Sequence, residues 1–125
     1  MNEWPYDVGP GWWVMLDEKL VAARKIAPDV KLEAKEKYGR CDAYFTTETE
    51  NREPLYRIEE EIEEQSLKIC EFCGQPGQQR TDRSWIQTLC DRCAAANSSQ
   101  ERQAVVQNEL KRYFQNQKTG EDLEE

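Results

Sequence analysis

Four cysteines in two closely spaced pairs constrain this chain more than any other feature of its sequence. Cys70 and Cys73 form one C-x2-C pair, Cys90 and Cys93 form the second, and sixteen residues separate the pairs. Two residues between paired cysteines allow a tight turn to aim both sulfurs at one point, and two such pairs complete a tetrahedron of thiolates around Zn²⁺. The spacing therefore predicts a structural zinc site. An iron–sulfur cluster and a redox dithiol stay open as alternatives.

A site with four thiolate ligands leaves no position for water or substrate, so its metal holds structure and does not perform hydrolysis. The sequence contains no histidine, the commonest general base and the commonest nitrogen ligand of metals. It also lacks a glycine-rich phosphate loop. We therefore expect a protein that is not an enzyme.

The metal site matters because the apolar content of the chain is low. Of its 125 residues, 38% are hydrophobic and 34% are charged, so a single domain of this length has a modest core that a metal crosslink would support. No run approaches the roughly 20 apolar residues of a membrane helix, and the N-terminus carries no secretory signal pattern. We expect a cytoplasmic protein without membrane association.

The first predicted element is a helix from Gly9 to Ala27, which Pro28 ends. Its apolar residues recur at three- and four-residue spacing and so share one buried face: Trp12, Leu16, Leu20, Ala23 and Ala27. Tryptophan is also enriched at binding hot spots. The alternative interpretation is therefore an aromatic docking patch made by Trp4, Trp12 and Trp13.

A β-hairpin is predicted to follow this helix. Apolar and charged residues alternate from Val30 to Lys35, and the alternation returns from Cys41 to Phe45. Tyr38-Gly39-Arg40 is the predicted turn, because glycine adopts positive φ without steric cost. Cys41, the odd cysteine, is interpreted as a small buried apolar residue and not as a reactive thiol.

An acidic helix is predicted from Arg52 to Lys68, with Pro54 in its first turn. Its apolar stripe is Leu55, Ile58, Ile62 and Gln65. From residue 48 to 64, eight glutamates outnumber two arginines, for a local charge of −6: Glu48, Glu50, Glu53, Glu59, Glu60, Glu61, Glu63 and Glu64. A solvated helix face is one interpretation. The other is a surface for a basic partner, whose candidate residues are Glu59, Glu60, Glu61, Glu63 and Glu64 together with Trp12 and Trp13.

Ser98 and Glu101 form a capping box that predicts a C-terminal helix to about Asn116.

The predicted fold is an α+β single domain. Its parts are residues 1–66 with a helix, the hairpin and the acidic helix; residues 67–97 with a four-cysteine zinc finger of ribbon or treble-clef type; residues 98–117 with the last helix; and residues 118–125 as a disordered acidic tail.

The charge of the chain disfavours direct binding to nucleic acid. Its net charge is −8, and an acidic surface repels the phosphates that dominate affinity for duplex DNA. The predicted finger carries a small basic and aromatic patch, made by Arg80, Arg83, Trp85 and Arg92. With four thiolates and one Zn²⁺ counted, however, residues 68–93 sum to −1. Nucleic-acid binding through this patch is therefore the alternative hypothesis.

Two runs carry a resemblance to a group of small bacterial and phage proteins. They are CEFCGQPG at residues 70–77 and WIQTLCDRCA at residues 85–94, with Arg80 between them. The likeness continues in GWW at residues 11–13 and KEKYG at residues 35–39, and it spans about residues 9–95. It implies a metal site and no particular activity. The chain departs from the usual apolar pattern of the group at Arg40-Cys41.

This resemblance suggests an inhibitor or adaptor. Phages encode many small acidic proteins that block host defences, among them anti-CRISPR proteins, and this analogy implies a host protein as partner, such as a nucleic-acid-binding defence effector. The finger also resembles that of DksA/TraR-type regulators of RNA polymerase, in which C-x2-C-Gly leads to Leu-Cys-x2-Cys. That likeness implies the alternative of a transcription-related protein that docks on RNA polymerase or DNA. The oligomeric state is left open.

Overall fold

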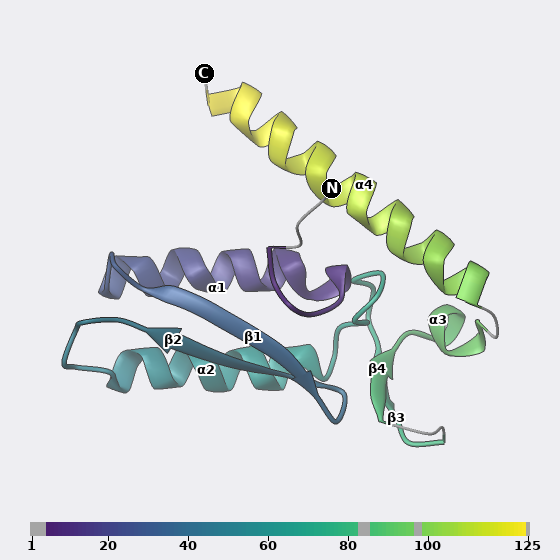
Figure 1. Cartoon of the computed structure of the whole chain (residues 1–125), viewed down its shortest axis with the longest axis horizontal. Coiled ribbons are helices and arrows are strands. Elements are labelled where there is room, and N and C mark those ends of the chain that lie inside the picture. Colours follow the sequence, from purple (N-terminus) through teal and green to yellow (C-terminus); the bar gives the residue numbers. More distant parts are fainter. Residues whose placement is uncertain (1–4, 83–85, 97–98, 125) are drawn as a thin grey trace.

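The computed structural model describes residues 5–82, 86–96 and 99–124. Three parts are visible in Figure 1: α1, a β-hairpin and α2 pack together, the finger lies beside them, and α4 runs from the finger across the start of α1. The elements are η1 (Pro10–Trp12), α1 (Trp13–Ile26), β1 (Lys31–Lys37), β2 (Arg40–Thr46), α2 (Glu53–Ser66), β3 (Gln78–Arg80), β4 (Gln87–Leu89), α3 (Asp91–Ala95) and α4 (Ser99–Glu124). The predicted α+β class is confirmed.

The predicted buried face of α1 is also confirmed. Leu16, Ala23 and Ala27 are fully buried, and Leu20 packs against the core from a half-buried position. The helix ends at Ile26, two residues before Pro28. Pro10 begins the short η1 turn that leads into α1, where a missing backbone N–H costs nothing.

The prediction that Trp12 and Trp13 contact a partner is wrong. Both residues are 0% exposed, because the end of η1 and the start of α1 turn their side chains inward toward other elements of the chain. The indole Nε1–H of Trp12 donates to the carbonyl oxygen of Ile69 at 2.8 Å, and that of Trp13 donates to Val8 at 3.0 Å. Trp4 lies outside the described residues.

The hairpin of β1 and β2 closes with a two-residue turn. Lys37 pairs with Arg40, so Arg40 already belongs to β2 and the turn consists of Tyr38 and Gly39. Their φ angles are 55° and 84°, as a type I′ turn requires. Cys41, Ala43 and Phe45 are buried, which confirms the predicted inward face of the return strand.

Side chains near and in α2 occupy the outer backbone edge of β2. Ser66 Oγ accepts from the Cys41 N–H at 2.8 Å, and a carboxylate oxygen of Glu59 accepts from the Phe45 N–H at 2.9 Å. Arg52 donates to the Phe45 carbonyl at 2.6 Å. Leu55, Ile58 and Ile62 are buried as predicted, but Ser66, not Gln65, continues the stripe because the edge of β2 needs its hydroxyl.

The last helix, α4, is longer than predicted. It continues to Glu124 through the segment for which a disordered tail was predicted. No proline interrupts residues 117–124, and glutamine, lysine, glutamate and leucine favour helix. Leu110 and Tyr113 are buried, and the Tyr113 ring packs edge-on against Trp13 at 5.1 Å. The predicted cap at Ser98 lies outside the described residues.

A single carboxylate joins the N-terminal segment, α1 and α4. Tyr6 donates its phenol to Asp17 Oδ1 at 2.5 Å, and Tyr113 donates to Asp17 Oδ2 at 2.6 Å. Burial, followed by the hydrogen bond to Asp17, raises the pKa of both tyrosines well above the usual value. Each phenol therefore stays protonated in the folded chain at a pH that ionises it in the unfolded chain.

This arrangement predicts a loss of stability at alkaline pH. Because the folded pKa is raised, the contribution of each tyrosine is complete below the unfolded pKa of about 10 and falls as pH rises above it. The variant Tyr113→Phe should therefore show a shallower decline of the free energy of unfolding above pH 10 in denaturant titrations. Tyr44→Phe, at an exposed tyrosine, is the matched control and should keep the parental slope.

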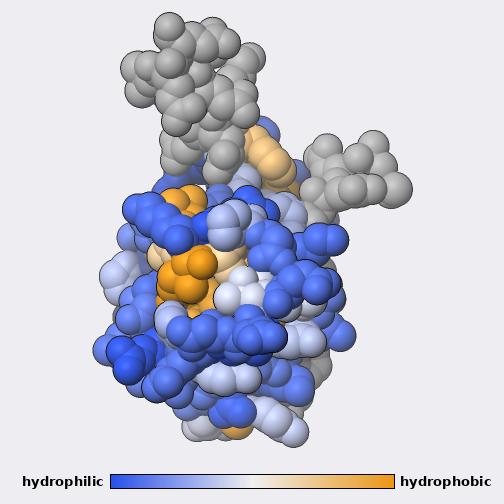
Figure 2. All heavy atoms as spheres, turned by 90° about the vertical axis from the view of Figure 1, so that its left-hand side faces the viewer, coloured by the Kyte–Doolittle hydropathy of each residue, from blue (hydrophilic) through white to orange (hydrophobic). Residues whose placement is uncertain are grey.

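The surface is mostly hydrophilic. Figure 2 faces the end of the molecule where α1 stops and shows a small apolar area among polar side chains. Towards that end α1 exposes Val21 and Ile26. Among the described residues, no helix has the length and apolar character needed to cross a membrane.

Candidate metal centre

The first cysteine pair lies on a tight turn after α2. The Gly74 N–H donates to the Cys70 carbonyl at 3.0 Å, and the Cys70 N–H donates to Gln75 at 2.7 Å. Gly74 has a φ of 79°, a conformation that glycine adopts without a Cβ penalty. This turn places Cys70 and Cys73 on the same side of the chain, as the C-x2-C spacing predicted.

The second pair lies at the start of a helix. The short strands β3 and β4 form an antiparallel hairpin, and β4 leads directly to Cys90. Cys90 caps α3, and its Sγ accepts from the Cys93 N–H at 3.4 Å. A knuckle, a hairpin and a helix that carries the second pair make up a finger of treble-clef type, one of the two predicted forms. Strand β4 covers residues 87–89, and residues 83–85 lie outside the described part.

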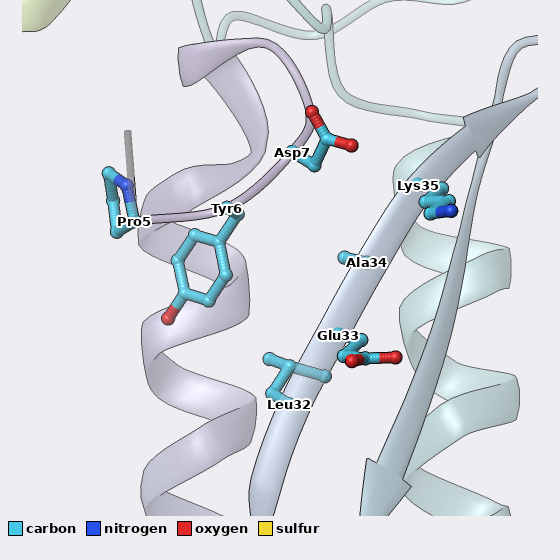
Figure 3. Close-up of a pocket in the computed structure, with 7 residues that line it drawn as sticks. All are labelled: Pro5, Tyr6, Asp7, Leu32, Glu33, Ala34 and Lys35. Atoms are coloured by element: carbon cyan, nitrogen blue, oxygen red, sulfur yellow. The ribbon is translucent and has the colours of Figure 1, made fainter. Parts of the chain in front are cut away.

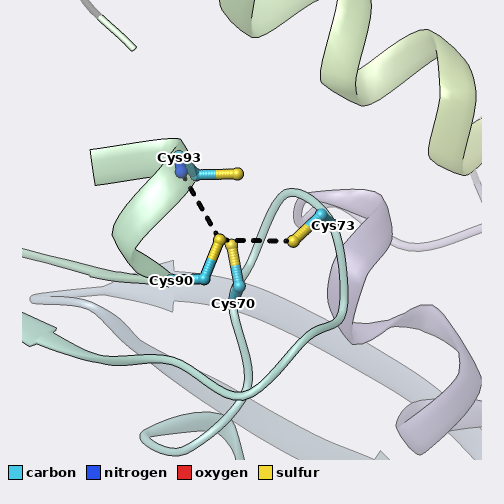
Figure 4. Close-up of side chains that lie close together, drawn as sticks. All are labelled: Cys70, Cys73, Cys90 and Cys93. Carbon is cyan, nitrogen blue, oxygen red and sulfur yellow. Dashed lines mark hydrogen bonds between the residues drawn. The ribbon is translucent and has the colours of Figure 1, made fainter. Parts of the chain in front are cut away.

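The four sulfurs converge (Figure 4). All four Sγ atoms lie within 4.8 Å of one another, and those of Cys73 and Cys90 are 3.5 Å apart. Four thiolates at about 2.3 Å from a central Zn²⁺ would lie about 3.8 Å apart, so the observed spacing fits such a tetrahedron. Three of the four cysteines are buried and Cys90 is half-buried. The group can hold a metal ion.

The Cys90 thiol ionises more readily than the thiols of Cys73 and Cys93. Burial raises the pKa of Cys73 to about 11 and raises that of Cys93 as well. Burial also raises the pKa of Cys90, but the Cys93 N–H and the neighbouring thiols outweigh it and bring the pKa to about 7. Metal binding requires the thiolate form of cysteine. The Cys93 N–H at the start of α3 therefore favours the form of Cys90 that can bind a metal.

Cys41 is not part of this group. Its side chain is fully buried in β2, and burial is the main reason that its pKa rises to about 12. A thiol with this pKa stays protonated and unreactive at neutral pH. The interpretation of Cys41 as a small buried apolar residue is confirmed.

The Gly-Pro-Gly segment packs directly on the first cysteine turn. The Gly11 N–H donates to the Glu71 carbonyl at 2.7 Å. A Cβ atom at Gly11 would lie 2.1 Å from the Cys70 carbonyl oxygen and 2.6 Å from the Gly74 nitrogen. Glycine is therefore required at this position, where two backbone segments from distant parts of the chain touch.

Two buried carboxylates near the cysteine turn were not predicted. Glu71 is 7% exposed and accepts from the Gly9 N–H at 3.1 Å. Its pKa rises to about 7, mainly through burial. Glu109 of α4 is also buried, and burial raises its pKa. Each is one acidic residue among 25, so no pattern in the sequence distinguishes them from solvated glutamates.

The tip of the first hairpin contacts the finger on another side. Thr88 Oγ1 donates to the Gly39 carbonyl, and the Gln79 amide donates to the Tyr38 carbonyl at 3.0 Å. The finger is therefore attached to the rest of the fold both at residues 9–12 and at the β1–β2 turn.

The predicted basic patch is only partly described. Arg80 donates to the Leu89 carbonyl at 3.1 Å and pairs with Asp91 at 2.7 Å, so its guanidinium is occupied within the finger. Arg92 is exposed on α3. Arg83 and Trp85 lie outside the described residues.

The predicted acidic residues of α2 differ in their surroundings. Glu59 is bound to the edge of β2 and lies 3.8 Å from Arg52. Glu61 pairs with Lys19 at 3.0 Å, and Glu63 lies 3.9 Å from Arg40. Glu60 and Glu64 are exposed, and neither has an ion-pair partner within the part of the chain that the structure describes.

Comparison of the chain with protein-family models, with curated proteins and with solved structures found no match.

Proposed function

We propose that this chain is a zinc-stabilised protein-binding module, not an enzyme, and that exposed carboxylates of α2 contact a basic partner. The observation that carries the proposal is the pair Glu60 and Glu64, exposed on the outer side of α2 without an ion-pair partner among the described residues. Contacts with the edge of β2 hold this helix in place.

Zinc is the metal that the donor set favours. Four thiolates in a closed tetrahedron are the usual ligands of structural zinc. Such a set leaves no coordination position for water, which supports a structural role over hydrolysis. The site joins the turn at Cys70 to the start of α3, and the chain has a modest core that such a crosslink would support.

The charge of α2 reduces the stability of the helix itself. Glu60 and Glu64 are four residues apart, and a like-charge pair at this spacing destabilises a helix by about 0.2–0.5 kcal/mol. Tyr56, one turn before Glu60, is 50% exposed, and tyrosine is enriched at protein interfaces. A basic partner would relieve the repulsion and cover the ring.

The chemistry of this surface fits a partner that binds nucleic acid. Neighbouring carboxylates on a rigid helix present negative charge in the manner of phosphates, and a phosphate-binding surface is rich in lysine and arginine. A host protein of this class, such as a defence effector, is the proposed partner. The alternative, a finger that binds DNA or RNA polymerase through Arg80 and Arg92, has less support because Asp91 and Leu89 already hold Arg80.

Charge reversal on α2 tests the proposal. In affinity capture from the native host, the Glu60→Lys/Glu64→Lys variant should lose the proteins that the parental chain retains, and its affinity for an isolated partner should fall by about tenfold or more. Binding of the parental chain should weaken as salt rises.

The matched control is Glu18→Lys/Glu33→Lys, which makes the same change in net charge at exposed sites outside α2. It should retain the partners. Equal recovery with both variants would show that α2 is not the binding surface. Thermal melts exclude unfolding as the cause, since reversal at Glu60 and Glu64 removes two exposed charges and no intramolecular ion pair among the described residues.

A further inference from the structure

We propose that the outer edge of β1 pairs with the same edge of a second copy of this chain to form a two-fold symmetric dimer. Three observations carry the inference: open backbone groups on β1, a groove beside them, and a charge pattern on the strand that is complementary to itself. The site is separate from the exposed carboxylates of α2, because α2 contacts β2, the other strand of the hairpin.

The register of the hairpin shows which backbone groups of β1 are open. Lys37 and Arg40 flank a two-residue turn, so they form a hydrogen-bonded pair, and such pairs recur at every second position of an antiparallel ladder. The backbone N–H and C=O groups of Leu32, Ala34 and Glu36 therefore point away from β2, toward the outer edge of the sheet.

The two outer edges of the hairpin have different surroundings. On β2, hydrogen bonds with α2 and Arg52 occupy the edge. On β1, the described part of the chain makes a single bridge, a parallel one between Asp7 and Lys35. The edge before Lys35 is therefore open, and an open edge is a template for pairing with a strand of another chain.

A groove runs along this open edge (Figure 3). It has a volume of about 610 Å³ and lies between residues 5–7 and residues 32–35. Leu32 and Ala34 point to the side of Tyr6, whereas Glu33 and Lys35 point away from it. A strand added here would continue both faces of the hairpin, because its side chains alternate in the same way.

The charges on β1 specify how two copies pair. With the two-fold axis at Leu32, this residue faces Leu32 of the second copy, and Lys31 faces Glu33 of the second copy on both sides of the axis. Outward-pointing residues are then paired with each other, as an antiparallel ladder requires. Lys31 and Glu33 are exposed, and neither has an ion-pair partner among the described residues. In the dimer each gains an opposite charge across the ladder, which is favourable.

The other registers that bring outward-pointing groups together are less favourable. An axis at Glu33 would place this residue opposite Glu33 of the second copy, and Lys31 opposite its Lys35. Like charges opposite each other destabilise a ladder. An axis at Ala34 would need the edge at Lys35, which the bridge with Asp7 already occupies. The charges and the bridge therefore select the register centred on Leu32.

The mixed charge of the edge favours a second copy over other strands. Edge lysines often prevent self-pairing, but here Glu33 lies between Lys31 and Lys35 and supplies the opposite charge. The groove lining has two acidic residues, Asp7 and Glu33, against Lys35, so Lys31 of the second copy brings a positive charge to it. A peptide with charges of one sign would meet a like charge at either Lys31 or Glu33. The second copy carries the required alternation in its own sequence.

Exchange of charges between the copies tests this register. Lys31→Glu and Glu33→Lys should each weaken self-association of the metal-loaded chain by about tenfold, because each places like charges opposite each other on both sides of the axis. An equimolar mixture of the two variants should associate again, since every glutamate of one then faces a lysine of the other. The double variant Lys31→Glu/Glu33→Lys should associate with itself as the parental chain does. Sedimentation velocity from about 10 µM to about 1 mM measures these equilibria.

The matched controls are Lys111→Glu and Glu18→Lys, which make the same single changes in charge at exposed positions outside the hairpin. Both should keep the parental association. Hydrogen exchange gives a second readout at the backbone. The amides of Leu32 and Ala34 should exchange more slowly as the concentration of the parental chain rises, and this protection should be lost in Lys31→Glu.

A chain that stays monomeric up to about 1 mM would overturn the proposal. Protection of the Leu32 and Ala34 amides by an added peptide in such a monomer would assign the edge to a heterologous strand instead. Association that is equal in all variants, or that does not recover in the mixture, would also contradict pairing through β1. None of these results bears on capture through Glu60 and Glu64.

Discussion

Removal of the metal with a chelator at neutral pH is expected to unfold the finger and to abolish most of the cooperative unfolding of the whole chain. In isolated finger peptides, four-ligand zinc sites contribute apparent free energies of about 10–16 kcal/mol. An entire domain is stable by only about 5–15 kcal/mol. The remainder of the fold shares this loss because residues 9–12 and the Tyr38-Gly39 turn rest on the finger.

The measurement combines metal analysis with thermal melts followed by circular dichroism. The parental chain should carry one zinc ion per chain, and Cys73→Ser should lose both the metal and the transition. Cys41→Ser is the matched control, because Cys41 lies outside the metal group; it should keep the full zinc content. A chelated protein with an unchanged melting temperature would contradict the proposed structural role of the metal, and iron in place of zinc would correct its identity.

The second large effect is expected from a single methyl group. In Gly11→Ala the new Cβ would overlap the Cys70 and Glu71 carbonyl oxygens and the Gly74 nitrogen, all of them backbone atoms that cannot rotate away. Overpacking of a well-packed site costs about 1–3 kcal/mol, and occasionally more, when it forces the backbone to move. We expect a large fall in the free energy of unfolding and weaker metal binding, both measurable by denaturant titration in the presence of a competing chelator.

Gly120→Ala provides the comparison for this substitution. Gly120 lies within α4, where alanine is favoured over glycine by about 0.8–1.0 kcal/mol, so the same change there should be neutral or stabilising. If Gly11→Ala behaved like Gly120→Ala, the close packing of residues 9–11 on the cysteine turn would not exist in solution.

The parts of the fold that were predictable from the sequence are those set by local spacing. Two C-x2-C pairs, the alternation around Cys41 and Phe45, and the apolar period of α1 each fix the direction of side chains over a few residues. The structure agrees with all three patterns. The type I′ turn was predicted only in part, because Tyr38 is an unusual residue at positive φ.

The features that the sequence did not predict depend on contacts between distant residues. A tryptophan pair suits a core and an interface equally well, and only the position of α4 and of Ile69 decides that Trp12 and Trp13 are buried. In the sequence, Asp17 is an ordinary acidic residue of α1, and only the structure shows that Tyr6 and Tyr113 both donate hydrogen bonds to it. Glu59 was likewise predicted to be a surface charge, whereas in the structure its carboxylate accepts from the Phe45 N–H at the edge of β2.

The contact of Gly11 with the Cys70–Gly74 turn also has a consequence for how the chain is made. Helix α1, the hairpin and α2 leave the ribosome first, yet the surface on which residues 9–12 rest forms only after the last ligand, Cys93, has been synthesised. Domains often fold from the N-terminus during translation. With the proposed zinc site, the residues before Cys93 must wait for this last cysteine and for the supply of metal, so we expect zinc shortage during synthesis to yield aggregation-prone chains, not folded apoprotein.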